Sequence, residues 1–296
     1  MELSDSETIV SINGTLTPPE EANVSVFDRG FLYGDSIYEV VLTYDKVPFL
    51  LDEHLARLQR SATGIGMKIQ YSSNQIKRYV EEGLEKMEHD RLYIRIIITR
   101  GAGKISLDPS QSDGQNLFII FKTLDQPDSS LYSKGVKLVS TDIIRNSKDN
   151  IDPGVKSGNY LNNVLALQEA KAKGGYDAIM LNSLGNVTES STANIWMVEK
   201  GHYITPPLSA GLLGGITRAK IIELGNEANK KMIEEDFNLE RLKLASEVFI
   251  TSSTRELMPV IQVDGAIIGT GAPGPAYREL HTLYLNYAHR KITDSH

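Results

Sequence analysis

The chain has 296 residues, of which 41% are hydrophobic and 23% are charged, and a formal net charge of −7. This composition is typical of a globular protein with one large or two medium domains, and it argues against general affinity for nucleic acid, which needs a basic surface. Cysteine is absent, which excludes disulfides, thiolate nucleophiles and iron–sulfur ligation. No apolar run is long enough to cross a bilayer, and the first residues lack a leader pattern. We therefore expect a soluble, cytoplasmic protein without a membrane partner.

The first 124 residues predict a smaller N-terminal α/β domain. The run TIVSINGTLT alternates polar and apolar residues around Asn13-Gly14, which is a strong hairpin signal. A helix is expected from Leu51 to about Gly64, with Asp52 as a possible N-cap. Further expected elements are two strands around residues 45–46, a helix over about 73–88, and strands in 91–101 and 116–124.

Residues 125–135 are polar and rich in turn formers, and they are the best candidate for an interdomain linker. The remainder, 136–296, predicts a larger C-terminal domain of mixed strands and helices. The expected strands are 136–145, 176–182, 193–207, 247–254 and 260–269, and the expected helices start near 160, 215 and 274. The whole pattern predicts two mixed α/β (α+β) domains.

Lys156 lies between two turn-forming stretches, Asp152-Pro153-Gly154 and Ser157-Gly158-Asn159. A loop lysine is by default a surface residue. The helix that follows carries apolar residues at a spacing of three and four, so the amine is also a candidate for the edge of a core. Desolvation there would lower the pKa of the amine and make it a nucleophile toward an aldehyde. The sequence leaves both interpretations open.

Two segments are suited to an anion. In GLLGGITRAKIIEL, residues 211–224, a glycine-rich loop precedes a helix that starts at Ile216 and Thr217, where free backbone N–H groups bind phosphate. Ser252, Ser253 and Thr254 follow a strand and offer further donors. The ordinary alternatives are a glycine turn with a threonine cap, and hydroxyl groups that bond within their own turn.

Charged side chains supply two further candidates. His54 and Arg57 lie three residues apart on one helical face, where the arginine is suited to clamp a dianion, although an exposed Glu53–Arg57 pair is the simpler explanation. Glu189 is a single carboxylate among strands, which suits a partner for a protonated ring nitrogen if it is buried. The histidines show no metal-binding spacing, so we expect no metal.

Six motifs occur in the order typical of one known family. They are YGDSIYEVV (33–41), EHLARL (53–58), KSGNYLNNVLA (156–166), GNVTESSTANIWMV (185–198), GLLGGITR (211–218) and TSSTRELMPVIQVDG (251–265). By these motifs the chain resembles the class IV, fold-type IV pyridoxal-phosphate aminotransferases. The resemblance implies a two-domain D-amino acid aminotransferase-like fold, pyridoxal 5'-phosphate as the cofactor, and a homodimer.

The resemblance also implies residue roles. Lys156 matches the catalytic lysine that binds the cofactor covalently and shuttles the Cα proton, and Glu189 matches the carboxylate that pairs with the pyridine nitrogen. The other cofactor-binding positions are Arg57, Ile216, Thr217, Ser252 and Ser253 at the phosphate, Leu213 against the ring, and Tyr160 near the phenolic oxygen, one residue closer to the lysine than in branched-chain enzymes. The substrate-binding positions are Tyr33, Tyr38, Tyr93, Arg95 and Thr254.

The substrate is less well defined by the motifs. Tyr93 and Arg95 resemble the branched-chain enzymes, in which such an arginine lets an apolar pocket accept glutamate, so the favoured reaction joins L-leucine, L-isoleucine or L-valine with 2-oxoglutarate. The YEVV motif resembles the D-amino acid enzymes instead. The alternatives are a D-amino acid or (R)-amine transaminase, an aminodeoxychorismate lyase, and a cofactor-free binding protein. Arg100 and Lys104 are further candidates for the substrate carboxylate.

Overall fold

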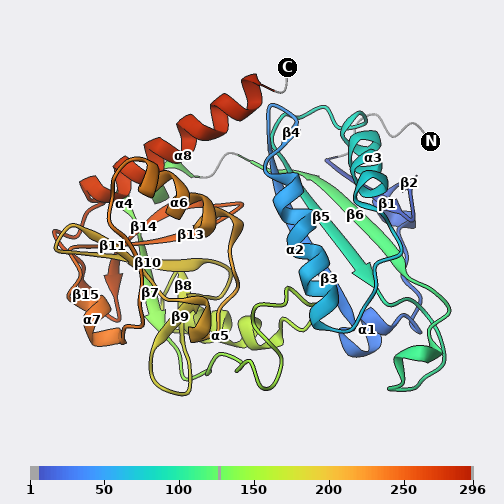
Figure 1. Cartoon of the computed structure of the whole chain (residues 1–296), viewed down its shortest axis with the longest axis horizontal. Helices are drawn as coiled ribbons and strands as arrows, with labels where there is room; N and C mark the ends of the chain where they lie inside the picture. The colour runs from blue at the N-terminus through green and yellow to red at the C-terminus, as the bar shows by residue number, and fades with distance from the viewer. Residues whose placement is uncertain (1–6, 126–127, 295–296) are drawn as a thin grey trace. The chain divides into compact units, whose positions relative to one another are not determined.

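The computed structural model describes residues 7–125 and 128–294, which form two compact units (Figure 1). Unit 1 comprises the described residues up to 125 together with 155–159. Unit 2 comprises the described residues of 126–154 and 160–294. Two residues of the expected linker, 126–127, lie outside the described residues, and the domain limits at 124 and 136 stay a prediction.

Unit 1 is built on a six-stranded antiparallel sheet in the order β2-β1-β6-β5-β3-β4. The strands are β1 (Thr8–Ile12), β2 (Thr15–Thr17), β3 (Ser36–Tyr44), β4 (Val47–Pro48), β5 (Leu92–Thr99) and β6 (Asn116–Thr123). The predicted hairpin turns are confirmed: Asn13 and Gly14 both have positive φ (53° and 89°), as do Asp45 and Lys46 (49° and 62°). Two central residues with positive φ form the turn that matches the twist of paired strands.

Two helices, α2 (Leu51–Gly64) and α3 (Ser73–Leu84), pack on one face of this sheet (Figure 1). The predicted bounds of α2 are confirmed, but its N-cap is Leu50, in the left-handed region at φ 56°, and not Asp52. The chain turns into α2 directly after β4, which places the cap earlier than the charge pattern indicates. The shorter elements of unit 1 are η1 (Pro19–Glu21), α1 (Arg29–Tyr33) and η2 (Pro109–Gln111).

Unit 2 contains a nine-stranded mixed sheet in which six strands close into a ring. The ring order is β10-β13-β14-β7-β8-β9, and it closes through the pairing of Asn194 in β10 with Glu189 in β9. The strands are β7 (Val136–Ser140), β8 (Asp177–Leu181), β9 (Val187–Ser190), β10 (Asn194–Glu199), β11 (His202–Thr205), β12 (Met232–Glu234), β13 (Glu247–Ser252), β14 (Glu256–Val263) and β15 (Ala266–Ile267). The core of unit 2 lies among these strands.

The helices of unit 2 are α4 (Ser129–Lys134), α5 (Leu161–Ala172), α6 (Ile216–Glu227), α7 (Leu239–Lys243) and α8 (Pro275–Thr293), with the short η3 (Leu208–Ala210). Helix α4 falls in the stretch expected to be the interdomain linker, and Asp128 caps it by accepting a hydrogen bond from the Ser130 N–H. Within the described residues no helix has the length and apolar character of a membrane span.

The apolar stripe of α5 is not directed toward the core of this chain, contrary to the expectation from its spacing. Leu161, Val164 and Leu165 are 68%, 54% and 42% exposed. The helix packs instead through the small residues Ala166 and Ala170, which belong to a cluster with two residues of β8. Small side chains allow the helix to approach the sheet closely, so the larger ones remain outside.

Candidate active site

The segment that carries Lys156 is held against β3 within unit 1. The Lys156 N–H donates to the Ser61 hydroxyl (3.0 Å), and the Lys156 carbonyl accepts from the Tyr38 N–H (3.0 Å). Ser157 forms a bridge with Ile37, and the Gly158 N–H donates to the Ser36 carbonyl (2.8 Å). The segment therefore continues the sheet locally, which fixes the position of a lysine that looks like a loop residue in the sequence.

The amine of Lys156 lies over an aromatic ring that it shares with an arginine. Its Nζ is 4.3 Å from the centre of the Tyr38 ring, and the guanidinium carbon of Arg95 is 4.0 Å from the same centre. Arg95 also donates to the Tyr93 hydroxyl at 3.3 Å. Since each cation contacts the ring of Tyr38, which is only 5% exposed, this aromatic residue holds both positive groups on one face of the sheet.

Arg57 is buried in a network on the opposite face of β3. Its Nε and Nη2 both donate to the Glu39 carboxylate at 2.7 Å, and the His54 Nδ1–H donates to the same carboxylate at 2.7 Å. An exposed pair with Glu53 is therefore the wrong explanation of this arginine. Burial would raise the pKa of Glu39, but the charge of Arg57 and the hydrogen bonds from Arg57 and His54 outweigh it and lower the pKa to about 2.

His54 is the neutral member of this network. Burial lowers the pKa of its imidazole below the usual value, and this effect outweighs the opposing one of Glu39. The nearby charges of Arg57 and Lys156 lower the pKa further. Because His54 is neutral, the charge of the Glu39 carboxylate is balanced in this network by the Arg57 guanidinium.

Arg100 is committed to a structural role within unit 1. Its Nε donates to Asp35 at 2.7 Å, and its Nη atoms donate to the carbonyls of Ile65 and Gly66 at 2.9 and 3.3 Å. Asp35 also accepts from Arg29 at 2.9 Å. Of the three cations considered for a substrate carboxylate, Arg100 is thus engaged by the protein itself, whereas Arg95 lies beside Tyr38.

Glu189 lies buried in unit 2 and has two kinds of partner. Its Oε1 accepts from the Arg145 Nε (3.0 Å) and Nη2 (2.9 Å). Its Oε2 accepts from the Leu213 N–H at 3.1 Å and from the Asn194 amide at 3.4 Å, and Asn194 also donates to the Leu213 carbonyl at 2.9 Å. A buried carboxylate in this position is suited to accept a hydrogen bond from a protonated aromatic nitrogen.

The first turn of α6, directly after the glycine-rich loop, presents backbone donors. Helix α6 starts at Ile216, and among the described residues no side chain caps its N-terminus. Its first backbone N–H groups have no carbonyl within the helix to bond to. Gly215 leaves no room for a side chain, because a Cβ there would clash with Asn194. Thr217 does not cap this end, since the N-cap position is Gly215, and an uncapped start of a twelve-residue helix remains suited to phosphate.

The predicted site residues thus fall into two groups. Lys156, Arg57, Tyr38, Tyr93 and Arg95 belong to unit 1, as does Tyr33 at the end of α1. Unit 2 holds the others, which are Tyr160 at the N-cap of α5, Glu189, Leu213, Ile216, Thr217, Ser252 at the end of β13, and Ser253 and Thr254 in the turn that follows. Their roles stay predictions.

Sequence reasoning missed Glu39 and Arg145, the charge partners of Arg57 and Glu189. Arg145 lies 44 residues from Glu189, and Glu39 lies 18 residues from Arg57. No local spacing rule joins residues so far apart. Only Glu39 had a sequence signal, since a glutamate in an apolar strand needs a buried partner.

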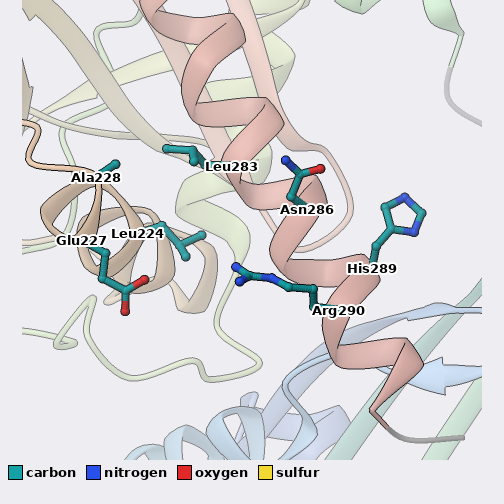
Figure 2. A pocket seen from close by; sticks show the side chains of 7 residues that line it. All are labelled: Leu224, Glu227, Ala228, Leu283, Asn286, His289 and Arg290. Carbon is teal, nitrogen blue, oxygen red and sulfur yellow. The ribbon is translucent and has the colours of Figure 1, made fainter.

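A groove of about 660 Å³ lies between α6 and α8 in unit 2 (Figure 2). Arg290 extends from α8 toward α6, whereas His289 points away from it. The lining residues are Leu224, Glu227, Ala228, Leu283, Asn286, His289 and Arg290, and none of them is a predicted site residue. Leu283 is half-buried and lines this groove. Among the described residues no group of three or more potential metal ligands occurs.

Comparisons with known proteins agree with these features. Residues 36–263 match the family described as "Amino-transferase class IV". A putative branched-chain-amino-acid aminotransferase of Methanocaldococcus jannaschii is 35% identical over 271 residues, covering 92% of this chain and 93% of that protein. A D-alanine aminotransferase of Bacillus licheniformis is 32% identical over 279 residues, covering 94% and 96%.

Solved structures show the same likeness. The T.th. branched-chain amino acid aminotransferase with pyridoxamine 5'-phosphate superposes with a TM-score of 0.89 at 28% identity, covering 95% of this chain and 93% of that one. The same enzyme has been solved with N-(5'-phosphopyridoxyl)-L-glutamate, with a TM-score of 0.88. The fold is therefore the two-domain fold of type IV aminotransferases, as predicted. The chain belongs to the class IV aminotransferases and is a pyridoxal-phosphate-dependent transaminase.

Proposed function

We propose that this enzyme moves an amino group between an L-branched-chain amino acid and 2-oxoglutarate. The observation that carries the proposal is the face of the unit 1 sheet around the Lys156 amine. Tyr38 and Val40 of β3 lie on the face opposite the core, and Arg95 pairs with Val40 in the register of β3 and β5. An apolar and aromatic surface with one guanidinium fits an aliphatic side chain and also the second carboxylate of glutamate.

The residues present fit pyridoxal phosphate by their donor chemistry. Lys156 is the amine that would bind the cofactor covalently, and the buried Glu189 carboxylate would pair with its ring nitrogen. The phosphate would be held by Arg57, the amides of Ile216 and Thr217, and the hydroxyls of Ser252 and Ser253, with Leu213 against the ring and Tyr160 near the phenolic oxygen. When bound, the cofactor supplies an electron sink for the charge that develops on the substrate Cα.

The protein then has to bind, orient and move a proton. With the cofactor bound, Lys156 would be the base that takes the proton from the substrate Cα, and its amine would hold that proton for the return transfer. The backbone bonds of Lys156 to Ser61 and Tyr38 keep the amine on the same side of the substrate for both transfers. Because the amino group remains on the enzyme between the two substrates, ping-pong kinetics are expected.

A D-amino acid specificity is the second candidate, since a D-alanine aminotransferase is 32% identical to this chain over nearly its whole length. The two are separated by adding L-leucine, L-glutamate, D-alanine or (R)-1-phenylethylamine to the purified enzyme and following the cofactor absorbance. L-leucine and L-glutamate should convert the cofactor, and 2-oxoglutarate should reverse the change. Conversion by D-alanine alone would refute the proposal, and pyruvate released without an amino acceptor would indicate a lyase.

Cofactor binding has its own test. The purified protein should be yellow, and Lys156→Ala should lose its colour on dialysis. A colourless wild-type protein that cannot be reconstituted with pyridoxal phosphate would refute the assignment of Lys156 and of the cofactor-binding residues.

We also propose that the enzyme is a homodimer. Both units expose apolar side chains that a second copy would cover: Phe31 and Leu107 in unit 1 are 70% and 81% exposed, and α5 in unit 2 exposes Leu161 and Val164. Large apolar side chains with such exposure are typical of protein–protein interfaces. Sedimentation analysis of the wild-type protein should show a dimer. The double variant Leu161→Glu/Val164→Glu should shift the equilibrium toward the monomer. A wild-type protein that sediments as a monomer would refute the proposal.

A further inference from the structure

Arg255 connects the turn between β13 and β14 to another part of unit 2. Ser252 pairs with Glu256 in the strand register, so Ser253, Thr254 and Arg255 form the turn itself. Ser252 and Ser253 are the hydroxyls proposed for the cofactor phosphate. The Arg255 N–H donates back to the Ser252 hydroxyl at 3.3 Å, so the arginine also bonds directly to one of these two groups.

The guanidinium of Arg255 reaches a different part of unit 2. Its Nη1 donates to the Asp177 Oδ2 at 3.0 Å and to the Thr192 hydroxyl at 2.8 Å. Asp177 is fully buried, whereas the Arg255 side chain is 24% exposed. A carboxylate without solvent contact depends on its charged partner, so this pair has one preferred geometry.

Asp177 is in turn hydrogen-bonded to the turn that follows Glu189. Its Oδ1 accepts from both the N–H and the hydroxyl of Ser191, and Thr192, the other partner of Arg255, is the next residue. These residues link β9, which carries Glu189, to β10. Arg255 therefore joins the turn proposed to bind the phosphate with the turn directly after the carboxylate proposed for the ring nitrogen.

We propose that Arg255 is a positioning residue that sets the place of the Ser252–Thr254 turn relative to Glu189 through Asp177 and Thr192. The inference rests on the proposed roles of Ser252, Ser253 and Glu189. A rigid cofactor binds tightly at both its phosphate and its ring nitrogen only when the protein groups for these two ends are held at a fixed separation. Loss of the Arg255 link removes none of the groups proposed to bind the cofactor. It lets the turn move, which weakens phosphate binding.

Other contacts keep this turn folded when Arg255 is replaced. The Tyr132 hydroxyl donates to the Arg255 carbonyl at 3.1 Å, a bond that does not depend on the side chain. Glu256 is in hydrogen-bond contact with His281 at 3.1 Å, and His281 stacks between the rings of Tyr132 and Tyr277. Replacing the Arg255 side chain therefore removes the link to Asp177 and spares the backbone anchors.

The test compares Arg255→Gln, Arg255→Lys and Asp177→Asn with the wild-type holoenzyme. The enzyme is converted to its pyridoxamine 5'-phosphate form with an amino donor, and the free cofactor is measured by fluorescence after ultrafiltration. The matched control is Arg241→Gln, since Arg241 is 30% exposed and pairs with Glu199 and Glu235 away from both turns. The melting temperature of each variant identifies the temperature range in which it is folded.

Arg255→Gln and Asp177→Asn should each raise the dissociation constant of pyridoxamine 5'-phosphate about tenfold, as removal of a ligand-orienting group typically does. The double variant that combines Arg255→Gln with Asp177→Asn should bind pyridoxamine 5'-phosphate no more weakly than each single variant does, because both changes break the same link. Arg255→Lys should recover part of the loss, and Arg241→Gln should bind as the wild type does.

A lower melting temperature with an unchanged dissociation constant would overturn the inference, because Arg255 would then only stabilise the fold. Equal losses in Arg255→Gln and Arg241→Gln, or strictly additive losses in the double variant, would overturn it as well. A wild-type protein that holds no cofactor would refute the proposed function and this inference together. If the wild type and the variants bind pyridoxamine 5'-phosphate equally tightly, this inference alone is refuted.

Discussion

The buried network of unit 1 leads to the sharpest prediction. Replacing Glu39 with glutamine removes the only carboxylate in the group formed by Arg57, His54 and Glu39, and it keeps the size of the side chain. Arg57 is only 5% exposed, so its guanidinium would remain buried with an amide in place of a charge. We expect a large loss of folding free energy, because an ion left without its partner pays for desolvation without compensation.

The magnitude follows from the pKa of Glu39. A pKa of about 2 in place of the ordinary 4.5 means that the folded state favours the ionised carboxylate by roughly 3 kcal/mol at neutral pH. Because the pKa is lower in the folded state, this contribution is complete above the unfolded pKa of 4.5 and is lost as the pH falls toward 2. At pH 3 it should amount to about 1.4 kcal/mol.

Urea denaturation of wild type and Glu39→Gln at pH 7 and pH 3 tests this. The difference in free energy of unfolding should be about 3 kcal/mol at pH 7 and roughly half of that at pH 3. Glu53→Gln is the matched control, since Glu53 is exposed on the same helix as Arg57, and it should change stability by less than about 0.5 kcal/mol. A difference at pH 7 no larger than that of the control, or one that grows on acidification, would refute the reasoning.

Three further changes have definite expectations. Arg145→Gln should lower the free energy of unfolding of the cofactor-free protein by about 3 kcal/mol in urea, because Glu189 loses its buried cation; a loss within the error of the measurement would contradict this. Arg95→Gln should raise the KM for L-glutamate about tenfold and change that for L-leucine much less, as steady-state kinetics would show, and equal effects on both would speak against a carboxylate contact. Gly83→Ala should lower the melting temperature, because the added methyl group would meet the Phe121 ring and overpacking typically costs about 1–3 kcal/mol; an increase would mean that helix propensity outweighs the clash.

Local chemistry made the elements of unit 1 predictable. The two hairpins follow from residues that accept positive φ, and α2 follows from an apolar spacing that places Leu55 and Leu58 in the core. The capping of α2 was not predictable in this way. The position of the N-cap depends on the direction in which the chain leaves the preceding strand. Here the chain leaves β4 and turns at Leu50, which has the left-handed conformation and is the N-cap.

The face of α5 shows where local rules fail. Its larger apolar residues have the spacing of a core stripe, yet Ala166 and Ala170 pack on the sheet, and Leu161 lies outside. Spacing identifies which residues share a face of a helix. It does not tell whether that face meets the core of the same chain or another surface.

The sequence by itself determined the family, the cofactor and the order of the motifs, because each motif is a short run whose residues act together. It determined in the same way that Lys156 stands beside a turn and that α6 starts after glycines. Only the tertiary structure decided which charges meet: Glu39 with Arg57, Arg145 with Glu189, and Asp177 with Arg255. These pairs join strands, helices and turns that are distant in the chain. A buried charge is tolerated only beside a partner, and folding brings the partner there from another element.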